Sequence, residues 1–163
     1  MSLRVGILTI SDMGARGDRE DTSGAVIREL LSDIDATVAR YEIIPDEAPQ
    51  ITERLTAWVS EGLNLIVTTG GTGLGPRDVT PGATLAAIDY EVPGIAEAMR
   101  AEGLKHTPMS MISRAVAGVR GQTLIVNLPG SPKGVRESLS VVLPVLTHAI
   151  ELLSGERSEH NPA

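Results

Sequence analysis

The sequence contains no cysteine and no phenylalanine, and among its 163 residues there are only one tryptophan and two tyrosines. The absence of cysteine excludes a disulfide framework, a thiol nucleophile and a cysteine-based metal site, and it is compatible with a reducing cytoplasm. The shortage of aromatic residues argues against a stacking platform for single-stranded nucleic acid, because such a surface needs several exposed rings. The hydrophobic core must therefore be built from Val, Ile, Leu, Ala and Met.

Positive charge is also scarce, since 14 Lys and Arg face 21 Asp and Glu and leave a net charge of −7. This balance argues against broad binding to nucleic acid or to an anionic membrane. It does not exclude a small anionic ligand, because backbone dipoles and a metal ion can override the global charge locally. No apolar run approaches the roughly 20 residues of a membrane span, and the apolar segment 1–10 is expected to be a strand rather than a signal peptide. We therefore expect a cytoplasmic protein with no nucleic-acid or membrane partner.

Strand-like and helix-like patterns alternate along the chain. Short apolar runs rich in β-branched residues predict strands over residues 3–10, 37–44, 63–69 and 123–128. Apolar stripes and helix-start signals predict helices over residues 22–31, 49–60, 93–103 and 131–153 and from residue 80 onward. Segment 107–114 is ambiguous, and residues 116–119 could form a hairpin with the strand at 123–128.

Local signals set the expected ends of these helices. A hydroxyl side chain can cap a helix start, so Thr22 or Ser23 is expected to cap the first helix. Thr80 is expected to cap the helix that begins with Pro81. Pro144 is expected to kink or interrupt the last helix, because proline lacks the backbone N–H.

The alternation predicts an α/β fold with three α/β/α layers around a mostly parallel central sheet. We expect a single domain over residues 1–154 and a polar tail over residues 155–163. In such sheets, ligands bind outside the carboxyl ends of the strands. Four segments are expected to meet there, at residues 11–12, 45–47, 70–78 and 129–134. Together they offer backbone amides and helix dipoles for phosphates and carboxylates for Mg²⁺.

The most distinctive motif is the glycine-rich segment TTGGTGLGPRDVTP at residues 68–81. It is not a P-loop, because Pro76 and Arg77 stand where that motif needs Lys and Ser or Thr. It is not a dinucleotide fingerprint either, because its glycines lack the final spacing. A flexible surface loop would explain the glycines. A backbone that must approach a ligand closely explains them better, because glycines lose much entropy when they are ordered.

Three aspartates lie in the segments expected at this sheet edge. Asp78 could be a helix-start acid that interacts with the helix dipole, but its position in the glycine-rich segment favours a functional role. Asp46 and Asp12 each follow a strand, and an ordinary turn aspartate is the alternative for both. Lys133 lies just inside a helix start, where a bound phosphate would explain a cation better than stability does.

A serine hydrolase is not indicated. Ser113 has no G-x-S-x-G elbow around it and no histidine nearby in the sequence. The histidines show no metal-ligand spacing and are expected to be structural or solvent-facing, at His106, His148 and His160.

Segment 68–81 closely resembles the signature of the molybdopterin adenylyltransferase family, the MogA/MoaB group, whose domain also occurs in plant cofactor-synthesis proteins and in gephyrin. Further motifs resemble the family in the same order, namely LTISD at 8–12, DTSG at 21–24, IPDE at 44–47 and SRAVAGVRGQTLIVNLPGSPKGVRE at 113–137. Several separate motifs in order are far more specific than one loop. The GPRD segment favours this family over related competence-damage-type proteins, whose loop carries paired aspartates.

The resemblance implies a reaction in molybdenum cofactor biosynthesis, the transfer of AMP from Mg-ATP to the terminal phosphate of molybdopterin with release of pyrophosphate. Molybdopterin would be the substrate, ATP the co-substrate and Mg²⁺ the metal. By motif match, Asp46 and Asp78 resemble the family's essential acids, which we expect to be catalytic and to hold the metal. The residues expected to bind substrate or nucleotide are Ser11, Asp12, Gly70, Gly71, Thr72, Gly73, Ser113, Pro129, Gly130 and Ser131.

The family also implies a homotrimer or hexamer and transfer of the product to a molybdate-inserting enzyme, in a molybdenum or a tungsten pathway. One departure is Gly82, which stands where the family usually has Glu and weakens the helix start by roughly 0.5–1 kcal/mol relative to Ala. Three hypotheses therefore remain: an active adenylyltransferase, a weak or inactive molybdopterin-binding paralogue that acts as a carrier or scaffold, and a nucleotide-processing hydrolase of the competence-damage type. Asp46, Asp78 and Ser113 favour the first over the second, and Arg77 followed by Asp78 disfavours the third.

Overall fold

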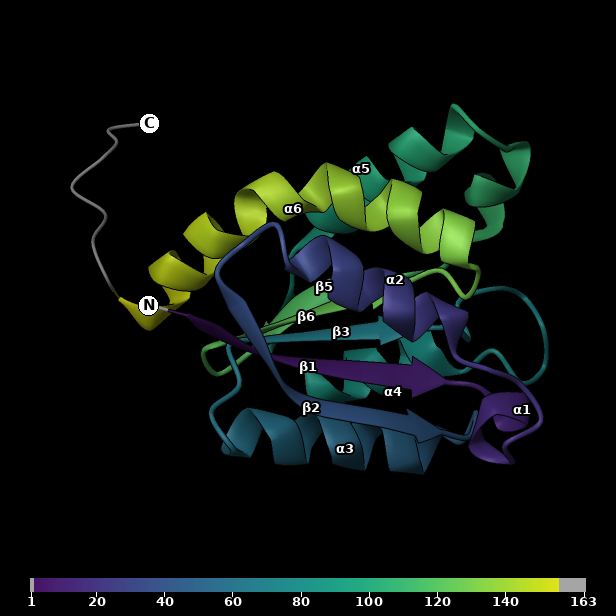
Figure 1. The fold of residues 1–163 in the computed structure, drawn as a ribbon, viewed down its shortest axis with the longest axis horizontal. Helices are drawn as coiled ribbons and strands as arrows, with labels where there is room; N and C mark the ends of the chain where they lie inside the picture. The colour runs from purple at the N-terminus through teal and green to yellow at the C-terminus, as the bar shows by residue number, and fades with distance from the viewer. Residues whose placement is uncertain (1, 156–163) are drawn as a thin grey trace.

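A six-stranded sheet forms the middle layer of the computed structural model, which describes residues 2–155 (Figure 1). The strands are β1 (Leu3–Ile10), β2 (Ala36–Ile44), β3 (Leu65–Thr69), β4 (Tyr90–Glu91), β5 (Ala117–Arg120) and β6 (Thr123–Leu128). Their order across the sheet is β2-β1-β3-β6-β5-β4. The first four strands in that order are parallel, and β5 and β4 are added antiparallel. The predicted mostly parallel sheet and the hairpin of β5 with β6 are both confirmed.

Helices cover both faces of the sheet. One face is covered by α2 (Thr22–Leu31), α5 (Pro93–Leu104) and α6 (Pro132–Ser154), and the other by α3 (Ala48–Ser60) and α4 (Thr80–Ala87) (Figure 1). The short helix α1 (Asp12–Ala15) follows β1, and the ambiguous segment forms a 3-10 helix, η1 (Pro108–Ile112). The predicted three-layer α/β/α architecture is therefore confirmed.

Alternation along the central strands builds a separate core on each face of the sheet. In β3, Leu65 and Val67 pack with α2, α5 and α6, whereas Ile66 packs with α3 and α4 on the opposite face. Trp58, the single tryptophan, is buried in the second core. The register makes the parallel strands end together at one edge, since Thr69 of β3 pairs with Thr9 of β1 and with Leu128 of β6.

The start of α2 differs from the prediction. Asp21 caps this helix, and its carboxylate accepts the backbone N–H of Gly24 at 2.9 Å. Thr22 and Ser23, the expected caps, are the first two residues of the helix instead. A carboxylate at this position also interacts favourably with the positive end of the helix dipole.

A second predicted cap is also wrong. Thr80 is the first residue of α4 rather than its cap, and the preceding Val79 makes no side-chain cap bond. Of the two outcomes expected at Pro144, a kink or an interruption, the interruption does not occur, since α6 continues through Pro144. Pro144 and Ser140 are exposed, so the carbonyl that loses its donor can bond to water, while packing of the buried face keeps the helix intact.

By length and composition, α6 is also the one helix in the described chain that could cross a membrane, since a window of 18 residues has a mean hydropathy of 1.3. This property was not expected from the sequence. It is weak support for a membrane span, because the core helix of a soluble protein passes the same test. Here the apolar side chains of one face of α6, among them Leu139, Leu146 and Ile150, are buried in the core with α2 and α5.

The contact of Gly6 in β1 with α3 generates a stability prediction. A Cβ at Gly6 would lie 2.6 Å from Cε3 of Trp58 and 2.9 Å from Cδ1 of Leu63. Gly6→Ala is therefore expected to reduce the free energy of unfolding by about 1–3 kcal/mol, the usual cost of overpacking a core. Urea denaturation followed by Trp58 fluorescence measures it.

Gly82→Ala is the matched control for this substitution. Gly82 is exposed in the first turn of α4, and a Cβ there would meet nothing within 4 Å. The control is expected to increase the free energy of unfolding by about 0.5–1 kcal/mol. Equal stability of the two variants would show that Trp58 does not pack tightly on β1.

Candidate functional site

The segments that follow the four parallel strands meet at one edge of the sheet, as predicted. Asp12 after β1 bonds to Asp46 after β2, through reciprocal N–H to carboxylate hydrogen bonds of 2.9 Å each. After β3, the N–H of Gly70 donates to the carbonyl of Leu128 at 3.2 Å. The hydroxyl of Thr69 donates to the carbonyl of Pro129 at 2.6 Å. Hydrogen bonds therefore join neighbouring strand ends along this edge.

Arg77, in the glycine-rich loop, connects this loop to the segments that follow β1 and β2. Its guanidinium donates to both carboxylate oxygens of Asp12, at 3.0 and 3.1 Å, and to Oε1 of Glu47 at 2.9 Å. The Arg77 hydrogen bonds, followed by the N–H of Asp46, hold the pKa of Asp12 below its ordinary value. The Asp12 side chain is thus fully occupied by protein donors, and it fastens the loops together.

Asp46 has the opposite electrostatic environment. Burial raises the pKa of Asp46 above its ordinary value, against the effect of the N–H of Asp12, and the negative charges of Asp12 and Asp78 raise it further. An ionised Asp46 is therefore costly in this fold, and a cation bound beside it would remove that cost.

The backbone of the glycine-rich loop lies so close to Asp46 and Asp78 that residues with a Cβ would not fit without a shift. Gly70 and Gly71 have φ values of +100° and +69°, which favour glycine. A Cβ at Gly71 would meet Oγ1 of Thr80 and would lie 3.1 Å from Oδ1 of Asp46. Further along the loop, the N–H of Gly75 donates to Oδ2 of Asp78 at 2.9 Å. The loop thus wraps around two acids at van der Waals distance.

Several backbone amides at this edge have no protein acceptor. Within residues 2–155, no hydrogen bond is made by the N–H groups of residues 71–73, nor by those of residues 130 and 131. The second pair lies at the start of α6, where the helix dipole adds partial positive charge. Amides of this kind are suited to bind phosphate oxygens.

Two adjoining cavities open at this edge. The first, which we call the acidic cavity, has a volume of about 530 Å³. Its wall includes residues 19–23, Asp46, residues 69–71, Asp78 and residues 130–132. The second, which we call the apolar cavity, has a volume of about 240 Å³. Its wall includes residues from α5, η1 and the first turns of α6. Ser131 lines both cavities.

The predicted site residues divide between these cavities. The acidic cavity is lined by Ser11, Asp46, Gly70, Gly71, Asp78, Gly130 and Ser131. The apolar cavity is lined by Thr72, Gly73, Ser113, Pro129 and Ser131. Asp12 lines neither cavity and instead positions Asp46 and Arg77.

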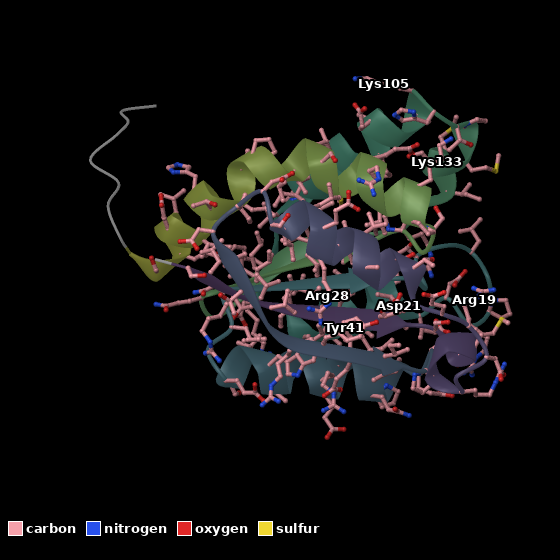
Figure 2. All side chains as sticks on the ribbon, in the orientation of Figure 1. Arg19, Asp21, Arg28, Tyr41, Lys105 and Lys133 are labelled. Carbon is pink, nitrogen blue, oxygen red and sulfur yellow. The ribbon has the colours of Figure 1, made fainter. Side chains whose placement is uncertain are left out.

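Sequence reasoning missed the residues that hold the DTSG segment on the wall of the acidic cavity. Asp21 accepts hydrogen bonds from the hydroxyls of Thr9, at 2.7 Å, and Tyr41. Arg28 lies 4.9 Å from the centroid of the Tyr41 ring (Figure 2). Burial, with the Asp21 hydrogen bond, raises the pKa of Tyr41 to about 12, so Tyr41 remains a donor at neutral pH. Ser23 then donates to the carbonyl of Gly130 at 2.6 Å and joins this segment to the start of α6.

Arg114 was also missed, although it fixes the glycine-rich loop from the other side. Its Nε donates to the carbonyl of Gly73 at 2.9 Å, and its Nη2 donates to the carbonyl of Asp78 at 2.7 Å. Its backbone N–H donates to the carbonyl of Thr72 at 2.8 Å. The adjacent Ser113 is held beside the loop as a result. The resemblance motif at 113–137 contained Arg114 but gave no indication of these partners.

The donor set fits a magnesium ion that arrives with phosphates rather than an ion held by protein alone. No group of three or more His, Cys, Asp or Glu residues in the described chain could hold a metal. Mg²⁺ commonly binds one or two carboxylates together with substrate phosphates, and Asp46 and Asp78 provide two. Oγ1 of Thr80, next to Gly71, is buried without a hydrogen-bond partner in the described residues, so the site also contains an unused polar atom.

Comparison with known proteins identifies the family of this chain. The family model described as "Probable molybdopterin binding domain" matches residues 6–148. The molybdopterin adenylyltransferase of Helicobacter pylori strain J99 is 39% identical over 163 residues, which cover 98% of this chain and 93% of that protein.

Solved structures agree with the sequence comparison. The molybdopterin biosynthesis enzyme MoaB from Thermus thermophilus is 60% identical, with a TM-score of 0.89 over 94% of this chain and 97% of that chain. The tungsten cofactor synthesizing protein MoaB from Pyrococcus furiosus is 33% identical, with a TM-score of 0.83 over 96% of this chain and 98% of that chain. Because the family model spans most of the chain and a relative is similar over nearly its full length, the chain belongs to the molybdopterin-binding domain family of cofactor biosynthesis proteins.

Proposed function

We propose that this protein transfers the adenylyl group of ATP to the terminal phosphate of molybdopterin and releases pyrophosphate. The observation that carries the proposal is the pair of adjoining cavities, one acidic and rich in unpaired amides and the other apolar, which meet at Ser131. A transfer between two substrates needs both bound side by side with their reacting groups in line. The relatives named molybdopterin adenylyltransferase support the same reaction.

The polar groups of the acidic cavity suit the phosphates of ATP. An oxygen of the molybdopterin phosphate would attack the α-phosphorus of ATP. The bond between the α-phosphorus and the oxygen that bridges the α- and β-phosphates would break, and pyrophosphate would leave. Phosphoryl-group transfer of this kind depends on positioning and on neutralisation of charge rather than on a covalent step with the protein. The amides of Gly71, Gly130 and Ser131 in this cavity would bind phosphate oxygens and stabilise the charge of the transition state. The amides of residues 72 and 73, in the wall of the apolar cavity, could bind the phosphate of the second substrate.

The acids have a separate role in this mechanism. Asp46 and Asp78 would hold Mg²⁺, which when bound neutralises phosphate charge. The cost of ionising Asp46 in the unliganded fold is then recovered when the metal and nucleotide bind. Ser113, at the rim of the glycine-rich loop in the apolar cavity, would bind the second substrate rather than act as a nucleophile.

A molybdopterin-binding carrier without catalysis is the second candidate, since Gly82 departs from the family pattern. Gly82 is exposed, and the acidic cavity is lined by both Asp46 and Asp78 without a side chain at position 82. The two retained acids favour the active enzyme. Incubation with molybdopterin and Mg-ATP separates the two candidates, because the enzyme forms pyrophosphate and an AMP adduct, whereas a carrier binds molybdopterin without turnover.

The proposal extends to the setting of the reaction. We place the enzyme in the cytoplasm as a homotrimer or hexamer, with its product passed to a molybdate-inserting enzyme. The family resemblance supports the assembly and the transfer of the product, and the absence of cysteine is compatible with a reducing cytoplasm.

Asp78→Asn is predicted to reduce adenylylation at least about 10²-fold, as expected for the loss of a main electrostatic contributor. The amide oxygen of Asn can still accept the N–H of Gly75, so the loop should keep its shape while the charge is lost. Pyrophosphate release measures the effect. Asp33→Asn, which removes an exposed acid after α2, is the control and should retain full activity. Near-normal turnover of the Asp78 variant would remove this residue from the mechanism.

Asp46→Asn is predicted to raise the melting temperature at pH 7 and to lower turnover. Because the folded-state pKa of Asp46 is raised, this group favours folding below its unfolded pKa, and the contribution is lost as pH rises through the folded pKa. At pH 7 the charged form is therefore strained, and neutral Asn relieves the repulsion from Asp12 and Asp78. The gain should shrink as pH falls toward 4, the region of the ordinary Asp pKa of about 3.9. Thermal unfolding at both pH values tests this, and a lower melting temperature at pH 7 would contradict it.

A further inference from the structure

The apolar cavity has a wall suited to a flat ring. Met99 and Ala96 of α5 and Met109 and Ile112 of η1 line it with aliphatic and thioether groups. Two charged side chains interrupt this wall, Arg100 and Glu137. Their hydrogen bonding differs, and this difference shows which of them is available to a ligand.

Arg100 is already used by the protein. Its Nη1 donates to the carbonyls of Ser113 and Ala115, at 3.3 and 2.9 Å. Ser110 donates back to the carbonyl of Arg100 at 2.9 Å. These bonds tie η1 and the segment after it to α5, so Arg100 shapes the wall.

Glu137 is placed differently, since its side chain is only 15% exposed but accepts no hydrogen bond from any residue in the described chain. Its Oε1 lies 3.6 Å from Nδ1 of His106 and 3.9 Å from Nζ of Lys133, which Figure 2 shows at the start of α6. Both distances are too long for a hydrogen bond. These contacts are long ion pairs, that of His106 only when its ring is protonated, and they leave the hydrogen-bonding positions of both oxygens unfilled. Donors supplied by a ligand could therefore fill them.

We propose that Glu137 binds the amino edge of the pterin ring and determines the specificity of the apolar cavity for a pterin. In a pterin, the N3–H and the 2-amino group point in the same direction and can donate in parallel to the two oxygens of one carboxylate. Paired hydrogen bonds of this kind are strong and selective, as between arginine and carboxylate. The inference rests on the proposed function, which makes molybdopterin the substrate.

The spacing along α6 is consistent with this orientation. Ser131, Gly134, Glu137 and Ser138 all line the apolar cavity from one face of the helix. With a rise of about 1.5 Å per residue, Glu137 lies roughly 9 Å along the helix axis from Ser131. A fused ring system held at Glu137 by one edge would therefore direct its phosphate-bearing end toward Ser131, where the acidic cavity begins. Glu137 is a specificity-determining residue in this arrangement and does not touch the reacting phosphorus.

The test compares two fluorescent probes, pterin and lumazine, in which a carbonyl replaces the 2-amino group. The full chain is expected to bind pterin about 10- to 100-fold more tightly than lumazine, the discrimination typical of one bidentate pair. Glu137→Gln should bring this ratio close to one, because a neutral amide presents one acceptor and one donor. In turnover, the same variant should raise KM for molybdopterin with little change in kcat, as expected for loss of uniform binding.

Glu102→Gln is the matched control. Glu102 also contacts His106, through Oε1 at 3.4 Å from Nε2, but it does not line the apolar cavity. The control should keep the pterin preference, and thermal unfolding of both variants separates a folding defect from a binding defect. An unchanged ratio in Glu137→Gln, an equal loss of both probes, or a wild-type protein without pterin preference would overturn the inference.

The outcomes also distinguish this inference from the proposed function. The full chain could release pyrophosphate with molybdopterin while the Glu137→Gln variant still prefers pterin. This result would support the proposed function and reject the role of Glu137. A pterin preference that depends on Glu137, without pyrophosphate release, would retain the role of Glu137 and reject adenylyl transfer.

Discussion

The candidate site depends on the paired hydrogen bonds between Asp12 and Asp46 across the ends of β1 and β2. Each carboxylate accepts the other residue's backbone N–H, so two acids are held together at the same sheet edge. Arg77 hydrogen-bonds to Asp12 and balances its charge, whereas it acts on Asp46 only through space and does not offset the effect of burial there. The same arginine belongs to the glycine-rich loop, and its bonds to Asp12 and Glu47 therefore also fix where that loop lies.

Some features of the site reduce the stability of the unliganded protein and prepare it to bind a ligand. A partly buried carboxylate at Asp46 and a buried hydroxyl without a partner in the described residues at Thr80 both carry a cost in the folded chain. Contacts of Arg114 with Gly73 and Asp78 keep the glycine-rich loop in this shape. The Asp21 and Tyr41 pair holds the neighbouring segment at residues 21–24. Proteins commonly break local rules of stability at functional sites and compensate elsewhere.

Part of this site could be read from the sequence because its signals are local. The ends of β1, β2 and β3 follow from short apolar runs, and the rule that ligands bind at the carboxyl edge then brings Asp46 and Asp78 together. The apolar cavity had no such signal, since its walls come from α5 and η1, whose packing depends on contacts such as Ser110 with Arg100. The role of Asp12 was equally hidden, because its partner Arg77 lies 65 residues away. The wrong cap of α2 has a similar cause, because the three polar residues at 21–23 offer competing acceptors and the backbone conformation selects Asp21 among them.

Ser131 belongs to the walls of both cavities and is also the cap of α6, where its hydroxyl accepts the N–H of Gly134 at 3.0 Å. A ligand that orders this residue from one side removes part of the entropy cost of ordering it from the other. Thermodynamic linkage makes such an effect reciprocal, so each substrate must change the affinity of the other by the same factor. Any coupling that passes through this shared residue would therefore act equally in both directions and would need no movement of the sheet.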